Sequence, residues 1–217
     1  MKNNKSLFLF GSVILFSMLI NVFHPYLWGP DEPREAEIAR ETFVSGNYVM
    51  PHLCDVPFAE KPPLYYNMVA VSYLIAGKAD PGAARLISAL LGIVMLGCVF
   101  LLGRRFLGTR QATIATALLL VMPQFYRAAH WILLDIGVGA FCCMALTAFA
   151  VYAFRDDRQR GNWPLYLFYL AAAAAFLSKS IAGIFHIAVV IAAYILIRRQ
   201  WALLRRLLTP LPMLCFL

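Results

Sequence analysis

Long apolar runs, separated by short charged segments, fill most of this chain. The runs are too long for strands and do not alternate apolar with polar positions, so they predict helices. A helix needs about 20 apolar residues to cross the hydrocarbon core of a bilayer, and somewhat fewer when its flanks help. We expect six spans, at residues 7–23, 86–102, 112–126, 131–154, 163–178 and 180–197. The predicted fold class is an all-α membrane protein, a polytopic helical bundle.

The segment between the first two expected spans differs from the rest because it carries most of the acidic side chains. Eight of the 11 acidic residues fall there: Asp31, Glu32, Glu35, Glu37, Glu41, Asp55, Glu60 and Asp80. Charged groups avoid the hydrocarbon core unless they face water, a partner or a substrate. We therefore expect a loop outside the bilayer over residues 24–82.

A helix is predicted at the start of this loop. Asp31 or Glu32 can cap it, with Pro33 tolerated in its first turn. Beyond the cap the spacing is helical, with an i,i+3 ion pair and a thin apolar stripe that suit a helix lying on the membrane surface. Those positions are Glu37 with Arg40 for the pair, and Ala36, Ala39 and Phe43 for the stripe. The helix is expected to end at 45–47, and residues 47–60 to form a loop.

Residues 62–77 are apolar but rich in tyrosine, so they fit either a thin span or an interfacial helix. The basic loops decide between these. Arginines follow the second, fourth and sixth expected spans, and cytoplasmic loops are the ones enriched in Lys and Arg. All three loops are cytoplasmic only if 62–77 does not cross. We predict an interfacial helix there, with a cytoplasmic N-terminus and the outer loop facing the periplasm or exterior.

Composition agrees with a membrane protein. The chain is 62% apolar and 14% charged, whereas a soluble domain is about half apolar and about a quarter charged. The net charge of +8 comes without a basic stripe interleaved with aromatics, so we predict no nucleic-acid binding. The five cysteines show no C-x-x-C spacing and indicate neither zinc nor a disulfide framework. Residues 1–23 resemble a signal peptide but lack a small-x-small cleavage site, which favours an uncleaved first span.

Opposite charges stand together twice in the outer loop, as Asp31 with Arg34 and as Glu60 with Lys61. A carboxylate can take a proton from a hydroxyl, and Arg or Lys can hold a phosphate. The sequence has no Gly-rich phosphate loop of the kind that binds nucleotides. The combination predicts transfer of a group from a phosphate-linked lipid donor at the membrane surface.

These same residues carry a resemblance to a known family. The runs GPDEPREAEIARE at 29–41 and EKPPLYY at 60–66 resemble the first outer loop of GT-C glycosyltransferases. The bacterial polyprenyl-phosphate sugar transferases, which include those acting on lipid A, are most similar, and the protein O-mannosyltransferases more distantly so. The stretches LGRRFLG at 102–108 and FLSK at 176–179 also resemble helix ends of that family. The resemblance implies a bundle of the GT-C type, of which residues 1–217 are the N-terminal part.

The resemblance also implies an activity. A sugar would pass from a polyprenyl-phosphate-linked donor to an acceptor hydroxyl on a lipid, glycan or protein, with inversion at the anomeric carbon. Asp31 would be the catalytic carboxylate, with Glu32 as a second acid or a helix cap. Arg34 and Lys61 would bind the donor phosphate and stabilise the charge that builds on it.

The remaining implied positions line or order the site. Lys179 would contribute to phosphate binding, and Asp135 would line the outer cavity. Glu60 would orient Lys61 or bind a divalent metal, and no other cofactor is implied. The expected location is the bacterial inner membrane.

Each assignment has a structural alternative. Arg34 can pair with Glu37 or Glu41, and Glu60 with Lys61 can be a surface pair of little energetic weight. Glu35, Glu37, Arg40 and Glu41 are expected on the solvated face of the surface helix, and Tyr65 with Tyr66 is expected as an interface anchor.

A second class of function is a transporter or flippase subunit for a lipid-linked or anionic substrate. Asp135, inside an apolar helix, favours it. Transporters place charges near the bilayer midplane within repeated halves, and here charges gather at the outer ends without a repeat. A third alternative is an inactive scaffold fragment, in which six complete spans do not close a cavity. A further apolar run begins at 207, and we expect the sequence to be part of a longer protein.

Overall fold

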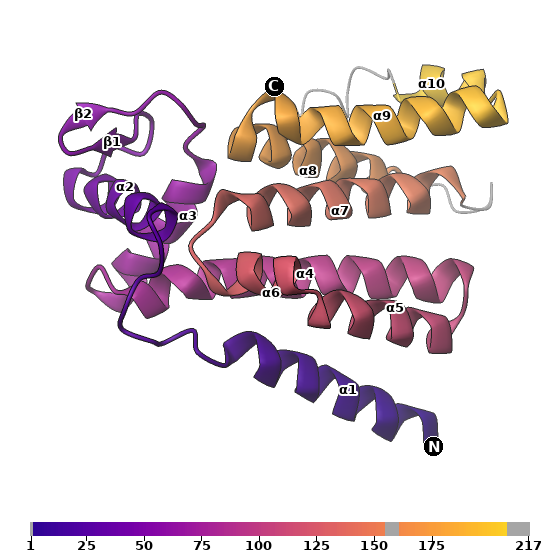
Figure 1. The fold of residues 1–217 in the computed structure, drawn as a ribbon. Helices are drawn as coiled ribbons and strands as arrows, with labels where there is room; N and C mark the ends of the chain where they lie inside the picture. Colours follow the sequence, from indigo (N-terminus) through magenta and orange to yellow (C-terminus); the bar gives the residue numbers. More distant parts are fainter. Residues whose placement is uncertain (1, 155–160, 208–217) are drawn as a thin grey trace.

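The computed structural model describes residues 2–154 and 161–207, and almost all of this chain is helical. The helices lie side by side, with a small hairpin at one end of the molecule (Figure 1). Their bounds are α1 Lys2–Leu19, α2 Asp31–Ser45, α3 Leu64–Ala76, α4 Pro81–Phe106, α5 Thr109–Val121, α6 Pro123–His130, α7 Leu134–Ala153, α8 Trp163–Lys179, α9 Ile181–Arg198 and α10 Trp201–Leu207. The hairpin pairs β1 His52–Leu53 with β2 Val56–Pro57.

The longer helices form the bundle by running back and forth along one axis (Figure 1). Within the described residues, α4, α7 and α9 are long and apolar enough to cross a membrane. α8 has 17 residues, about 25 Å of helix. α7 packs chiefly against α8 and α4, which makes it the centre of the bundle.

Two apolar cores hold the bundle together. One joins the end that carries α2 and α3 to α4, α6 and the start of α7, around Ile38, Tyr65 and Ile132. The other joins α7, α8 and α9, around Phe149, Leu165 and Ile191. The first core fixes the predicted outer loop to the bundle, so α2 and α3 are packed elements of the fold.

Helices are present at both places where the outer loop was predicted to hold one. α2 ends where Gly46 adopts a left-handed backbone with φ of 68°, as the Ser-Gly-Asn signal indicated. α3 has 13 residues, about 20 Å of helix, which is less than the roughly 30 Å of a hydrocarbon core. This length agrees with the prediction that 62–77 does not span. The loop predicted at 47–60 contains the hairpin of β1 and β2.

The prediction of one continuous helix over 112–126 is wrong. The helix breaks after Val121 into α5 and α6, and Met122 is extended with ψ of 124°. The cause is Pro123, which lacks an N–H and disfavours the helical conformation of the residue before it. Likewise α7 begins only at Leu134, after an extended stretch that leads out of α6. The first helix also starts and ends earlier than expected, at Lys2 and Leu19.

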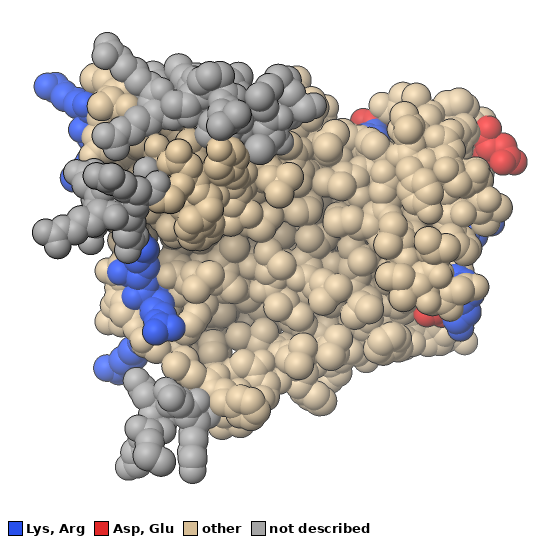
Figure 2. Space-filling model, turned by 180° about the vertical axis from the view of Figure 1, so that it is seen from behind, with Lys and Arg blue, Asp and Glu red and all other residues tan. Residues whose placement is uncertain are grey.

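Charges are segregated along the bundle axis. The last turn of α4 carries Arg104 and Arg105, and α9 ends on Arg198. Figure 2 shows Lys and Arg side chains without acids along one edge of the molecule, acidic together with basic side chains at the opposite end, and a tan band between them. The expected arginine loop around 155–160 and the apolar run after 207 lie outside the described residues.

Candidate active site

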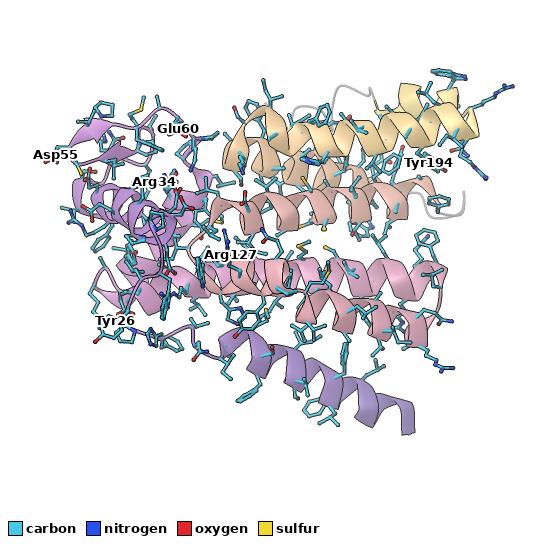
Figure 3. The ribbon with its side chains drawn as sticks, viewed as in Figure 1. Tyr26, Arg34, Asp55, Glu60, Arg127 and Tyr194 are labelled. Atoms are coloured by element: carbon cyan, nitrogen blue, oxygen red, sulfur yellow. The ribbon has the colours of Figure 1, made fainter. Side chains whose placement is uncertain are left out.

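Two of the predicted site residues, Arg34 and Lys61, meet on the carboxylate of Glu35, and a third, Asp31, contacts Arg34. Arg34 Nη2 lies 3.0 Å from Asp31 Oδ1 and 3.1 Å from Glu35 Oε1. Lys61 Nζ donates to the same Glu35 Oε1 at 2.8 Å. Arg34 comes from α2 and Lys61 from the segment before α3, at the end of the molecule where Figure 3 labels Arg34, Glu60 and Asp55. The structure therefore brings Arg34 and Lys61, from the two charged motifs, together on one acid.

The burial of these groups differs sharply. The side chains of Asp31 and Arg34 are 49% and 41% exposed, whereas that of Glu35 is 3% exposed. Asp31 and Arg34 can therefore reach a ligand from solvent, while Glu35 acts inside the protein. The expectation that Glu35 lies on a solvated face is wrong. The thin stripe of alanines turns α2 toward α3, and that contact covers Glu35.

Tyr66 completes the set. Its hydroxyl donates to Glu35 Oε2 at 2.6 Å, and its side chain is fully buried. Tyr65 is buried as well and shares a hydrogen bond of 2.7 Å with Ser88 of α4. Both tyrosines pack inside the fold, so the prediction of an interface anchor is wrong for the pair.

Glu35 also governs the electrostatics of its neighbours. Its hydrogen bond raises the pKa of Arg34, with Asp31 adding a smaller effect of the same sign. Burial raises the pKa of Tyr66 above its ordinary value, and the nearby Glu35 carboxylate raises it further. Tyr66 thus remains a neutral donor, and Arg34 remains a cation, across physiological pH.

Glu32 does not share the exposure of Asp31. It is fully buried and forms an ion pair with Arg85 of α4 at 2.7 Å. Its oxygens also accept from the backbone N–H groups of Trp28 at 2.6 Å and Ile132 at 3.2 Å. Glu32 thereby ties together the loop before α2, the start of α4 and the stretch before α7. It does not cap α2 with its side chain, and neither does Asp31.

Arg85 uses its remaining donors in the same junction, on the carbonyl oxygens of His24 and Tyr26. It also lines a pocket of about 320 Å³ together with three aromatic side chains, Trp28, Tyr126 and Trp131. Because four hydrogen bonds to protein acceptors, two of them on the Glu32 carboxylate, already hold it, Arg85 contributes structure to this pocket and does not offer a free cation.

Asp135 and Lys179 form an ion pair between the start of α7 and the end of α8, and both reach solvent. They stand close to α3. A Cβ on Gly137 would lie 3.5 Å from Tyr65 and 3.7 Å from Ser178, so α3, α7 and α8 meet within two residues of the pair. The structure places both residues at the same end of the bundle as the Arg34 and Lys61 set.

Glu60 is exposed, and the partner that holds Lys61 is Glu35 rather than Glu60. Among the described residues, no group of three or more His, Cys, Asp or Glu side chains could hold a metal ion. What the structure does show is two cations, Arg34 and Lys61, on one buried carboxylate, with the Asp31 carboxylate beside Arg34.

Sequence reasoning missed three residues that shape this site: Glu35, Tyr66 and Arg85. Arg85 carried a usable signal, because a lone charge at the start of an apolar helix implies a buried partner. Glu41 was also expected to be merely solvated. Instead its carboxylate accepts from the backbone N–H groups of Cys54 and Asp55 and pins the hairpin turn to α2.

Comparison with known proteins places the chain. The family profile described as dolichyl-phosphate-mannose-protein mannosyltransferase matches residues 60–217. The chain belongs to this family. The matched range includes Lys61, Tyr66, Arg85, Asp135 and Lys179, while the residues of α2 precede it.

Two relatives of this family member align with most of its chain. The undecaprenyl phosphate-alpha-4-amino-4-deoxy-L-arabinose arabinosyl transferase of Shewanella sediminis is 30% identical over 196 residues, covering 86% of this chain and 36% of that protein. The enzyme of the same name from Aeromonas hydrophila is 28% identical over 188 residues, covering 86% of this chain and 34% of that protein.

Solved structures resemble this mannosyltransferase family member along its whole length. ArnT from Cupriavidus metallidurans bound to undecaprenyl phosphate superposes with a TM-score of 0.88 and 30% identity, over 98% of this chain and 39% of that chain. The apo state of the same protein gives 0.87 and 29%. The predicted all-α polytopic bundle of the GT-C type is confirmed. The chain spans well under half the length of these relatives.

Proposed function

We propose that this protein is a glycosyltransferase that moves a sugar from a polyprenyl-phosphate-linked donor to an acceptor hydroxyl. Family membership supports the reaction class. The likeness to a structure bound to undecaprenyl phosphate supports a polyprenyl phosphate as the carrier. The observation that carries the proposal is the joint approach of Arg34 and Lys61 beside the partly exposed Asp31 carboxylate.

The proposed roles follow from this geometry. Arg34 and Lys61 hold the donor phosphate, since each retains N–H groups beyond the one that binds Glu35. Asp31 takes the proton of the acceptor hydroxyl while the oxygen of that hydroxyl attacks the anomeric carbon of the sugar. The bond between that carbon and the phosphate oxygen breaks, and the phosphate keeps the electron pair. Attack opposite to the leaving group inverts the anomeric configuration.

Glu32 takes a positioning role in this proposal, because its oxygens are committed to Arg85 and two backbone N–H groups. Lys179 and Asp135 stand as a second charge pair at the same end, where Lys179 adds positive potential for the phosphate. No step is assigned to a metal. The acceptor is a hydroxyl on lipid A, another glycan or a protein, and the natural location is the inner membrane with this end facing outward.

Replacing Asp31 by Asn tests the catalytic assignment. The amide cannot accept a proton from the acceptor hydroxyl, so we expect turnover to fall by about 100-fold or more. The measurement is sugar transfer from undecaprenyl phosphate-4-amino-4-deoxy-L-arabinose to lipid A by the purified protein at its natural length. Binding of undecaprenyl phosphate should persist, because Arg34 and Lys61 remain.

Asp55→Asn is the matched control, since Asp55 is an exposed acid of the hairpin at the same end of the molecule (Figure 3). It should leave turnover within about twofold of the parent, as surface substitutions usually do. Full activity of Asp31→Asn would remove Asp31 from the chemistry. Failure of the parent to bind any polyprenyl phosphate would remove the proposed donor class.

A further inference from the structure

We propose that Glu35 is a positioning residue that aligns Arg34 and Lys61 into a single phosphate clamp, a term used here for those two cations together. The inference rests on the proposed function, because it presumes that the cations bind the donor phosphate. It assigns the alignment to a buried acid that the site chemistry does not otherwise use.

The first argument is the geometry of a shared oxygen. Arg34 Nη2 and Lys61 Nζ both donate to Glu35 Oε1, at 3.1 and 2.8 Å. The two nitrogens must therefore lie within about 6 Å of each other, a spacing that one phosphate group can bridge with two charge-assisted hydrogen bonds. A single acceptor atom thus sets the separation of the two donors.

The second argument is that Glu35 links separate parts of the chain. Arg34 belongs to α2, whereas Lys61 lies 26 residues beyond Glu35, after the hairpin. Within the described residues, the ion pair that holds the Lys61 ammonium is the one with Glu35. Without that contact, the flexible stem of Lys61 has no partner that fixes its head next to Arg34.

The third argument is that Glu35 is itself held rigidly. Its side chain is 3% exposed, and Tyr66 donates to its second oxygen at 2.6 Å. Burial and Tyr66 fix the carboxylate before any ligand arrives. A preorganised donor pair loses less conformational freedom on binding than two free side chains would.

The proposed alignment and simple charge neutralisation predict opposite changes in phosphate affinity when Glu35 is replaced, so an experiment can separate them. If Glu35 only neutralised the cations, its removal would leave more positive charge in the site and tighten binding of an anion. If Glu35 aligns the cations, its removal weakens binding despite the gain in positive charge. Glu35→Gln keeps the shape of the side chain and removes the negative charge.

The experiment compares binding of undecaprenyl phosphate with binding of undecaprenol, its neutral counterpart, to the purified protein at its natural length. Glu37→Gln is the matched control, because Glu37 pairs with Arg40 on the same helix and remains partly exposed. We expect Glu35→Gln to lower affinity for the phosphate about tenfold and Glu37→Gln to change it less than twofold. Undecaprenol should bind all variants alike.

A coupling measurement separates alignment from general damage. In a Lys61→Ala background the clamp has already lost one cation, so Glu35→Gln should cost about threefold or less there. Tyr66→Phe leaves the carboxylate in place but frees one oxygen, and it should cost about threefold in phosphate affinity. If Glu35→Gln does not fold, the phosphate affinity of Tyr66→Phe tests whether the position of the Glu35 carboxylate matters for binding.

The outcomes distinguish the two claims. If the parent binds the phosphate no better than undecaprenol, the proposed function fails. If the parent prefers the phosphate and Glu35→Gln binds it equally well or more tightly, the function stands and the role of Glu35 is overturned. Equal losses for both lipids in Glu35→Gln, with Tyr66→Phe unchanged, would also overturn it.

Discussion

Adjacent residues at the start of α2 serve opposite purposes. Asp31 has a half-exposed side chain, whereas Glu32 is fully buried against Arg85. Successive side chains on a helix point about 100° apart, so neighbouring acids face different surroundings. One faces the open end of the molecule, and the other holds the junction between the loop before α2, the start of α4 and the segment before α7. Motif spacing alone cannot separate such neighbours.

The Glu32 and Arg85 pair leads to a stability prediction. Glu32→Gln leaves the buried Arg85 cation without its counter-charge, and loss of one partner of a buried pair costs about 3–5 kcal/mol. We expect Glu32→Gln and Arg85→Met each to lower the thermal unfolding midpoint of the detergent-purified protein. In the double variant no buried charge stands alone, so its midpoint should fall by less than the two single losses combined. Additive losses would contradict an energetically coupled pair.

The residue scale is also where sequence reasoning failed most. It placed Asp31, Arg34 and Lys61 in one site, and the structure brings them together. It expected Glu35 on the solvated face of a surface helix. Burial of Glu35 depends on α3 packing against the alanine stripe of α2, a contact between segments far apart in sequence. Periodicity within one helix does not reveal which partner covers it.

At the scale of elements, apolar runs were found reliably and their interruptions were not. Residues 112–126 were expected as one helix, but Pro123 divides them into α5 and α6. By contrast, the turn from α8 to α9 falls where the expected spans 163–178 and 180–197 met. Ser180 adopts a positive φ of 57°, and α9 begins at the next residue. Such a turn requires close approach of two backbones, which only small residues permit.

Gly183 tests that close approach. A Cβ on Gly183 would lie 2.2 Å from the carbonyl oxygen of Ala175, so a methyl group there forces α8 and α9 apart. We expect Gly183→Ala to destabilise the protein by about 2 kcal/mol or more, the range of an overpacked interior. The measurement is the thermal unfolding midpoint in detergent.

Gly97→Ala is the matched control in α4. A Cβ on Gly97 would meet nothing within 4 Å, and alanine favours helix by about 1 kcal/mol over glycine. Its midpoint should stay equal to that of the parent or rise. If Gly183→Ala behaved in the same way, the α8 and α9 backbones would not be as close as the structure places them.

At the scale of the whole molecule, the charge pattern was predicted well. Counting spans with 62–77 excluded put the basic loops on one side, and the C-terminal ends of α4 and α9, which carry Arg104, Arg105 and Arg198, lie opposite α2 (Figure 1). Errors in the predicted helix ends did not affect this result, because the side of each loop depends only on whether an odd or an even number of crossings precedes it. The broken α5 and α6 together still return the chain to the α2 end (Figure 1).

This polarity leads to a prediction about orientation. Positive charge favours the cytoplasmic side, so the opposite end, which carries the site, should face outward. Cys54 is a natural probe because its thiol is exposed in the hairpin at the site end, whereas Cys98 and Cys142 are buried and Cys143, within α7, is only partly exposed. A membrane-impermeant maleimide should label Cys54 in sealed right-side-out vesicles, and Cys54→Ser should remove that label.

The opposite end supplies the control. Arg110 is exposed in the first turn of α5, beside the end of α4. In a Cys54→Ser background, Arg110→Cys should be labelled only after the vesicles are opened or inverted. A protein in the reverse orientation would give the reverse pattern, and its Asp31, Arg34 and Lys61 would face the cytoplasm. A donor phosphate at the outer leaflet would then be out of reach of these residues. The proposed reaction at the outer leaflet therefore requires that Cys54 be labelled in sealed right-side-out vesicles and that Arg110→Cys not be labelled there.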